Sequence, residues 1–150
     1  MSETGRHERD IVVGVDGSEA SLDALRWAAR QARLTGAPLL AVTAWAFPEH
    51  PTPFGIVPDL PLPPDELDRV RARLDEATRA VVGPDEVDLR TDVVPGDAAA
   101  VLLRAAEEAQ LLVVGNRGRG TFAGVLLGSV TARVVHHAPC PVVVVRHRAP

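Results

Sequence analysis

Five glycines and two arginines gather in the segment 115–129, and these residue types are suited to holding an anion. Glycine lets the backbone adopt positive φ and approach a ligand closely, which exposes consecutive N–H groups as an anion-binding nest. At the end of the segment, Gly128-Ser129 precedes a predicted helix, whose free N-terminal amides and positive dipole end favour phosphate. The Ser129 hydroxyl can cap that helix or bond a phosphate, while Arg117 and Arg119 add positive charge. This segment, called the glycine loop below, therefore predicts a phosphate site.

Two common phosphate motifs do not describe the glycine loop. A dinucleotide fingerprint needs a glycine three residues beyond Gly120, where Ala123 stands, and follows the first strand of its fold. A P-loop needs a lysine, whereas all 16 basic residues of this chain are arginine. A plain surface loop is the remaining alternative. The glycine spacing and the terminal Gly-Ser favour nucleotide binding over that alternative.

Alternating strands and helices must position the glycine loop. Short apolar runs predict five strands, at residues 11–15, 39–45, 87–93, 111–114 and 142–145. Apolar residues spaced by three and four predict four helices, which begin after Ser18, near Asp65, after Asp97 and at Ser129. This order predicts an α/β fold, a doubly wound five-stranded parallel sheet in a single domain. In such sheets, ligands bind beyond the carboxyl ends of the strands, where the strand order reverses.

A proline-rich segment interrupts this alternation. Seven of the chain's 13 prolines fall in residues 47–64. Because proline fixes φ and donates no hydrogen bond, we expect no regular element to persist there. The segment is expected to be an extended, semi-rigid surface loop, either a functional lid or a mobile excursion.

The composition excludes several classes of function. The chain has 150 residues, a net charge of -4 and 3% aromatic residues, so it offers neither a basic field for nucleic acid nor a base-stacking platform. Its apolar runs are far shorter than the roughly 20 residues that span a bilayer, and its first residues do not form a signal peptide. We expect a cytoplasmic protein without nucleic-acid or membrane partners, with a flexible N-terminus at residues 1–9 and one domain over residues 10–147.

The glycine loop resembles the ATP-binding members of the universal stress protein family, which carry Gly-x2-Gly-x9-Gly-(Ser/Thr) after the fourth strand. Gly115, Gly118, Gly128 and Ser129 fit every fixed position of that motif. The resemblance extends to the opening IVVGVDGS at residues 11–18, to LLVVG at 111–115 and to the closing APCPVVVV at 138–145. Gln110 and Ala98 depart from residues that the family often has, aspartate and proline, but neither position contacts the ligand in the family pattern.

The resemblance implies a set of binding residues. Asp16 matches the acidic residue on the ribose and adenosine side of the ligand, and the main chain around Val42 matches the position that reads the adenine edge. Gly115 is expected near the ribose. The residues expected to hold the phosphates are Gly118, Gly128, Ser129 and Val130, and Arg117 is a candidate phosphate clamp. The implied cofactor is ATP, with Mg or Mn bridging its phosphates.

Three hypotheses about function follow. The first is a universal stress protein that acts as a nucleotide-responsive regulatory or stress-survival module. The alternatives are a slow ATPase and a structural dimer that binds no nucleotide. We predict no catalytic residue, because Asp16 is assigned to the ribose and His136 and His137 fall at the far end of the last helix, about 10 Å from the phosphates. The apolar strand 142–145 is expected to form a homodimer, as it commonly does in the family; a further protein partner is unknown.

Overall fold

The computed structural model describes residues 10–45, 49–52, 55–58, 64–83, 87–118 and 126–147. The strands of its main sheet are β1 (Ile11–Gly14), β2 (Leu39–Trp45), β5 (Leu89–Pro95), β6 (Leu111–Gly115) and β7 (Val142–Val145). The helices between them are α2 (Glu19–Thr35), α3 (Pro64–Val82), α4 (Ala98–Ala105) and α5 (Ser129–His137). A separate hairpin consists of β3 (Glu49–Thr52) and β4 (Gly55–Pro58).

The main sheet is parallel throughout, and its strand order is β5-β2-β1-β6-β7. β1 lies at the centre, where Ile11 is in register with Leu39 on one side and Leu111 on the other. The chain first winds outward through β2 and β5, and then returns to the other side of β1 through β6 and β7. The doubly wound parallel sheet predicted from the sequence is therefore confirmed, and its strand order reverses between β1 and β6.

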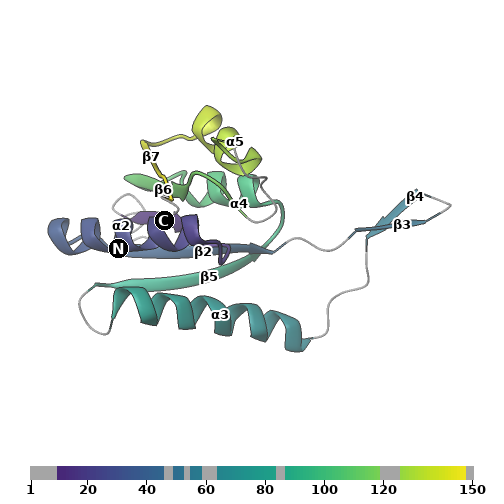
Figure 1. The fold of residues 1–150 in the computed structure, drawn as a ribbon, viewed down its shortest axis with the longest axis horizontal. Helices are drawn as coiled ribbons and strands as arrows, with labels where there is room; N and C mark the ends of the chain where they lie inside the picture. The colour runs from purple at the N-terminus through teal and green to yellow at the C-terminus, as the bar shows by residue number, and fades with distance from the viewer. Residues whose placement is uncertain are drawn as a thin grey trace.

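Two helices cover each face of the sheet (Figure 1). On the face under α2 and α3, the core contains Leu25, Leu39 and Leu74, all of which are almost completely buried. On the face under α4 and α5, the core is smaller and is built around Leu102, Leu112 and Val134. Burial of the strands on both faces explains why their sequences are continuous apolar runs rather than alternating ones.

Helix caps fix where the connections leave the sheet. The Ser18 side chain accepts a hydrogen bond from the Ser21 amide and begins α2, and Asp97 accepts one from the Ala100 amide and begins α4. Gly36 ends α2 in the left-handed conformation, with φ 74°. Ser18 and Asp97 stand where the sequence predicts these helices to begin, because serine and aspartate are usual N-cap residues, and glycine is the usual residue at a left-handed helix end. β5 lies at one edge of the sheet and begins and ends two residues later than the predicted strand 87–93.

The proline-rich segment does contain regular structure, so the prediction that none persists there is wrong. β3 and β4 pair antiparallel, with Glu49 opposite Pro58 and Pro51 opposite Ile56. In an antiparallel hairpin, residue pairs that exchange hydrogen bonds alternate with pairs whose N–H groups point outward. Both prolines fall in alternate pairs, so both can occupy the outward positions, where no amide proton is needed. Figure 1 shows this hairpin standing apart from the sheet and its helices. Its main contacts within the described chain are between its own two strands.

Two other features bear on the sequence predictions. The N-terminal segment 1–9, predicted to be flexible, lies outside the described residues. Across the parts of the chain that the structure describes, no helix combines the length and apolarity needed to cross a membrane.

Candidate functional site

A pocket of about 260 Å³ opens at the carboxyl ends of β1 and β6, where the strand order reverses. Parallel α/β sheets bind ligands at this point because adjacent connections diverge to opposite faces and leave a crevice. All eight site residues predicted from the sequence line this one pocket: Asp16, Val42, Gly115, Arg117, Gly118, Gly128, Ser129 and Val130. They come from four separate segments of the chain. Arg119 lies outside the described residues.

The pocket has further lining residues that the sequence analysis did not assign to it: Gly14, Val15, Ser21, Ala44, Ala98, Leu102, Val114 and Thr131. Most are small or apolar residues on helices and strands, where a pocket wall has the same pattern as a core position. Ala98 was expected to lie away from the ligand, but the structure places it in the lining. Gly14 is informative, because a Cβ there would lie 3.0 Å from the Leu102 side chain. A glycine inside an apolar strand run, directly before Val15-Asp16, indicates a close approach of another residue and could have identified this wall from the sequence.

Asp16 is held at the mouth of the pocket by the turn that joins β1 to α2. Its Oδ1 accepts a hydrogen bond from the Ser18 amide at 2.9 Å, and its own amide donates to the Ser21 hydroxyl at 3.3 Å. A carboxylate that bonds the amide two residues later forms an Asx-turn, which fixes the side-chain direction. Asp16 is exposed, so its carboxylate can meet a ligand.

Val42 lies deeper, on the α4 side of β2. Its carbonyl accepts a hydrogen bond from the Val15 amide at 2.9 Å, and its side chain is 2% exposed. The neighbouring Thr43 hydroxyl donates to the Val15 carbonyl at 2.8 Å. These bonds join the ends of β1 and β2 and give the pocket a fixed floor.

Two glycines of the loop approach neighbouring atoms closely. A Cβ on Gly115 would lie 2.7 Å from the backbone carbon of Ala20, at the start of α2. A Cβ on Gly118 would lie 2.7 Å from Asp16 Oδ2. The first contact is with rigid backbone, whereas the second is with the end of a side chain. Gly115 therefore serves packing between β6 and α2, and Gly118 brings the loop backbone against the Asp16 carboxylate.

The far end of the glycine loop presents the N-terminus of α5 to the pocket. The N-cap is Gly128, which has no side chain to satisfy the first amides, and the first helical bond runs from Ala132 to Gly128. Ser129 is the first helical residue, so it does not cap the helix as the sequence analysis allowed. The Thr131 hydroxyl donates to the Gly115 carbonyl at 2.7 Å and binds α5 to β6. The amides of residues 129–131 have no acceptor within the helix, which makes this end suited to an anion.

Charged side chains around the pocket are arranged to hold its walls together. Asp97, the cap of α4, also pairs with Arg133 of α5 at 2.9 Å. The bond from the Ala100 amide, aided by the Arg133 guanidinium, lowers the pKa of Asp97. Burial raises the pKa of the Cys140 thiol, which favours the thiol over the more nucleophilic thiolate.

The described residues contain no cluster of three or more His, Cys, Asp or Glu side chains that could hold a metal ion. His136 and His137 are exposed at the C-terminal end of α5, as predicted, where they complement the helix dipole. Asp16 is the one carboxylate among the described lining residues. Among the described lining residues, Arg117 and the free amides at the start of α5 are the groups suited to an anion.

Comparison with known proteins gives a consistent result. The model of the universal stress protein family matches residues 8–146. The chain is 38% identical over 152 residues to universal stress protein Rv2623 of Mycobacterium tuberculosis, covering 95% of this chain and 49% of that protein. It is 36% identical over 142 residues to a universal stress protein of Mycolicibacterium smegmatis, covering 92% of this chain and 48% of that protein. The chain thus spans about half the length of these curated relatives.

Solved structures show the same likeness. The universal stress protein UspA from Lactobacillus plantarum matches with a TM-score of 0.72 and 29% identity, covering 93% of this chain and 98% of that chain. A universal stress protein in complex with cAMP matches with a TM-score of 0.64 and 32% identity, covering 91% of this chain and 95% of that chain. The chain belongs to the universal stress protein family.

Proposed function

We propose that this chain binds ATP in the pocket between β1 and β6 and acts as a nucleotide-responsive regulatory or stress-survival module. The observation that carries the proposal is the convergence of four separate segments, each with a residue of the nucleotide-binding pattern, on one pocket at the reversal of strand order. A surface loop that happened to be rich in glycine would not bring Asp16 and Val42, from two other segments of the chain, to the same pocket.

Each part of the nucleotide has a matching part of the pocket. The adenine would lie against Val42 and the apolar wall of Ala98 and Leu102, with its edge read by the main chain around Val42. The ribose hydroxyls would donate hydrogen bonds to the Asp16 carboxylate, near Gly115. The phosphate oxygens would accept hydrogen bonds from the Arg117 guanidinium and from the amides of Gly118, Gly128, Ser129 and Val130.

The relative that was crystallised with cAMP supports nucleotide binding as a class, because it shares 32% identity over most of this chain. cAMP has one phosphate, whereas the glycine loop and the N-terminus of α5 offer two groups of amides to an anion. Two groups suit a chain of phosphates, which favours ATP for this chain.

A Mg or Mn ion is proposed to bridge the phosphates. The described lining supplies one carboxylate and no ligand cluster, so phosphate oxygens and water would provide most of its coordination. This arrangement fits Mg²⁺, which keeps several waters and is often bound through substrate phosphates. The ion would neutralise charge on the phosphates while the chain's own residues position them.

Fast hydrolysis is not expected from this pocket. In-line attack on a phosphate needs a base or a residue that positions water. Asp16 is engaged at the ribose end, and the two histidines of α5 do not line the pocket in the described residues. ATP would therefore act by changing the conformation or the partner of the protein, with at most slow turnover.

Two measurements test nucleotide binding. Mass spectrometry of the denatured purified protein identifies any co-purified nucleotide, and calorimetry with ATP and with cAMP gives their affinities. We expect ATP to bind in the presence of Mg²⁺ and binding to weaken in an Asp16→Ala variant. Absence of ATP binding with retained cAMP binding would refute ATP as the ligand, and absence of both would leave the structural dimer as the function.

We further propose that the chain is a cytoplasmic homodimer joined through β7. Val142–Val145 is a short apolar edge strand whose residues are only partly covered within one copy. Antiparallel pairing about a twofold axis would cover both edges at once. Changing Val143 and Val145 to arginine should give monomers in analytical ultracentrifugation. A dimer that persists in the double variant would refute this interface.

A further inference from the structure

Asn116, between the first two glycines of the motif, is almost completely buried, with 4% of its surface exposed. It does not line the nucleotide pocket. A buried amide side chain is costly unless its polar atoms are bonded, so its presence needs an explanation other than ligand contact.

Four hydrogen bonds satisfy Asn116 and involve both its main chain and its side chain. Its carbonyl accepts from the Gly128 amide at 2.8 Å, and its Nδ2 donates to the Leu126 carbonyl at 3.3 Å. These two bonds join the start of the glycine loop to its end. Its amide donates to the Val145 carbonyl at 2.9 Å, and its Oδ1 accepts from the His147 amide at 3.1 Å. The second pair joins the loop to the segment that follows β7.

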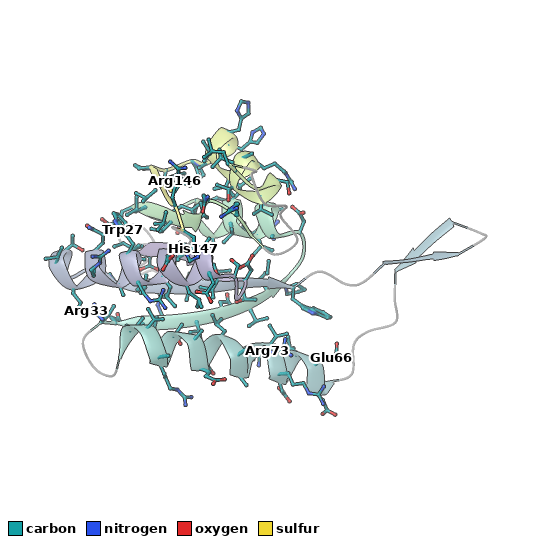
Figure 2. The ribbon with its side chains drawn as sticks, in the orientation of Figure 1. Trp27, Arg33, Glu66, Arg73, Arg146 and His147 are labelled. Carbon is teal, nitrogen blue, oxygen red and sulfur yellow. The ribbon has the colours of Figure 1, made fainter. Side chains whose placement is uncertain are left out.

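The segment after β7 is itself anchored. His147 Nδ1 lies 2.6 Å from Asp23 Oδ2 on α2, and Asp23 also pairs with Arg26 at 2.7 Å. Figure 2 shows His147 beside α2, with Arg146 on the side of β7. The hydrogen bond from His147 lowers the pKa of Asp23. The contacts therefore run from α2 through His147 and Asn116 to both ends of the glycine loop.

We propose that Asn116 is a positioning residue of the nucleotide site, which holds the two ends of the glycine loop together and makes phosphate affinity depend on the main chain at His147. This inference rests on the proposed nucleotide binding. Gly128 caps α5, and its amide bonds directly to Asn116, so displacement of Asn116 moves the α5 N-terminus relative to Gly118. The amides that would hold phosphate then no longer converge. The apolar wall for the base, formed by α4 and β2, is independent of these bonds.

The proposal predicts that phosphate binding and nucleoside binding separate. Asn116→Asp keeps an acceptor for the His147 amide but replaces the Nδ2 donor with an oxygen that faces the Leu126 carbonyl. We expect the affinity for Mg-ATP to fall at least about tenfold while the affinity for adenosine is unchanged, measured by calorimetry. An equal loss for both ligands would indicate a purely structural role and overturn the proposal, as would wild-type affinity for ATP.

Substitutions at residue 147 test the link to the segment after β7. His147→Pro removes the amide that donates to Asn116, whereas His147→Ala keeps this amide and removes only the imidazole. We expect the proline variant to lose ATP affinity several-fold more than the alanine variant. Arg146→Ala is the control for changing this segment and should bind as the wild type does. Equal affinities of the proline and alanine variants would refute the role of the His147 amide.

A measurement without ligand separates this proposal from the proposed function. Asn116 is the only asparagine in the chain, so labelling with 15N-asparagine gives one side-chain amide signal. Its protons should exchange slowly with solvent in the wild type and faster in His147→Pro. Unchanged exchange would overturn the positioning role. If the wild type binds no ATP, the proposed function fails, and the exchange result alone then decides whether Asn116 orders the loop.

Discussion

The segments that follow β6 and β2 leave the same edge of the sheet but behave in opposite ways. After β6, the chain turns at Asn116, and the described parts of the glycine loop are bonded to β7, to α5 and to each other. After β2, the chain reaches a hairpin whose main contacts are internal and which stands apart in Figure 1. The two strands lie on either side of β1, so position in the sheet does not cause the difference.

The difference follows from the residue types. Glycine lets backbone approach backbone, as Gly115 approaches Ala20, and leaves every amide able to donate. Proline removes donors and keeps the chain extended, so a proline-rich segment makes few bonds to the body of the protein. The glycine loop is therefore a candidate binding segment, whereas the described hairpin contacts mainly itself. The predictions below test this contrast.

The largest effect is expected at Gly115. In Gly115→Ala the new Cβ would meet the Ala20 backbone at 2.7 Å, so β6 or α2 must shift, at a cost of about 3 kcal/mol. Gly36→Ala is the matched control, because Gly36 has φ 74° and open space around it, and it should cost about 1 kcal/mol. Urea denaturation measures both free energies of unfolding. Equal losses would mean that β6 and α2 adapt to the added Cβ and that close packing does not require a glycine at position 115.

The next effect concerns ligand binding without loss of the fold. ATP at a hundredfold excess over its dissociation constant should stabilise the wild type by about 2.7 kcal/mol. Gly118→Val should lose this gain, because its side chain displaces the Asp16 carboxylate and fills the phosphate approach, and Gly128→Val should do the same. Thermal unfolding with and without Mg-ATP measures the gain. The site assignment is wrong if both variants keep the full shift.

The sequence predicts the fold well because its signals are local. Ser18, Gly36 and Asp97 mark helix ends by their own chemistry, and continuous apolar runs mark strands buried on both faces. The pocket residues of the glycine motif were also identified, since the motif lies within 15 consecutive residues. Contacts between distant residues leave no such signal. Asp23 and His147 are 124 residues apart, and nothing near either one indicates the other.

The hairpin was missed for a different reason. Proline content argues against strands in general, yet two strands with prolines only in alternate pairs remain possible, and this depends on the register. Register is set by pairing, which composition does not show. The walls at Ala98 and Leu102 were missed because helix periodicity does not separate core positions from pocket positions.

Acid should weaken the bonds that hold the pocket side together. The pKa of Asp97 is lowered in the folded state, so its contribution to stability is present above the unfolded pKa near 4 and is lost as the pH falls through the folded pKa. The pKa of Asp23 is lowered in the same direction. Asp97→Asn keeps a capping side chain but loses the charge that pairs with Arg133, so its stability should fall less steeply below about pH 4 than that of the wild type.

Asp97→Ala loses the cap as well and should cost about 1 kcal/mol at neutral pH. Circular dichroism of urea unfolding between about pH 3 and pH 6 tests both variants. Identical pH slopes for the wild type and Asp97→Asn would show that this ion pair contributes nothing to acid sensitivity.

The smallest effect is expected from the hairpin. A two-stranded hairpin is marginally stable by itself, and this one gains few contacts from the other described residues. Replacing residues 47–62 by a glycine-serine linker of the same length keeps the loop-closure entropy similar and removes only the hairpin. The free energy of unfolding should then change by no more than about 0.5 kcal/mol, and the stabilisation by ATP should be unchanged. The same replacement of residues 117–127 should abolish that stabilisation, because it removes the Arg117 guanidinium and loosens the backbone that holds Gly118 and the Leu126 carbonyl, the acceptor for Asn116 Nδ2. If the hairpin replacement instead lowers ATP affinity, the proline-rich segment reaches the pocket and is a lid, and the contrast between the two segments fails.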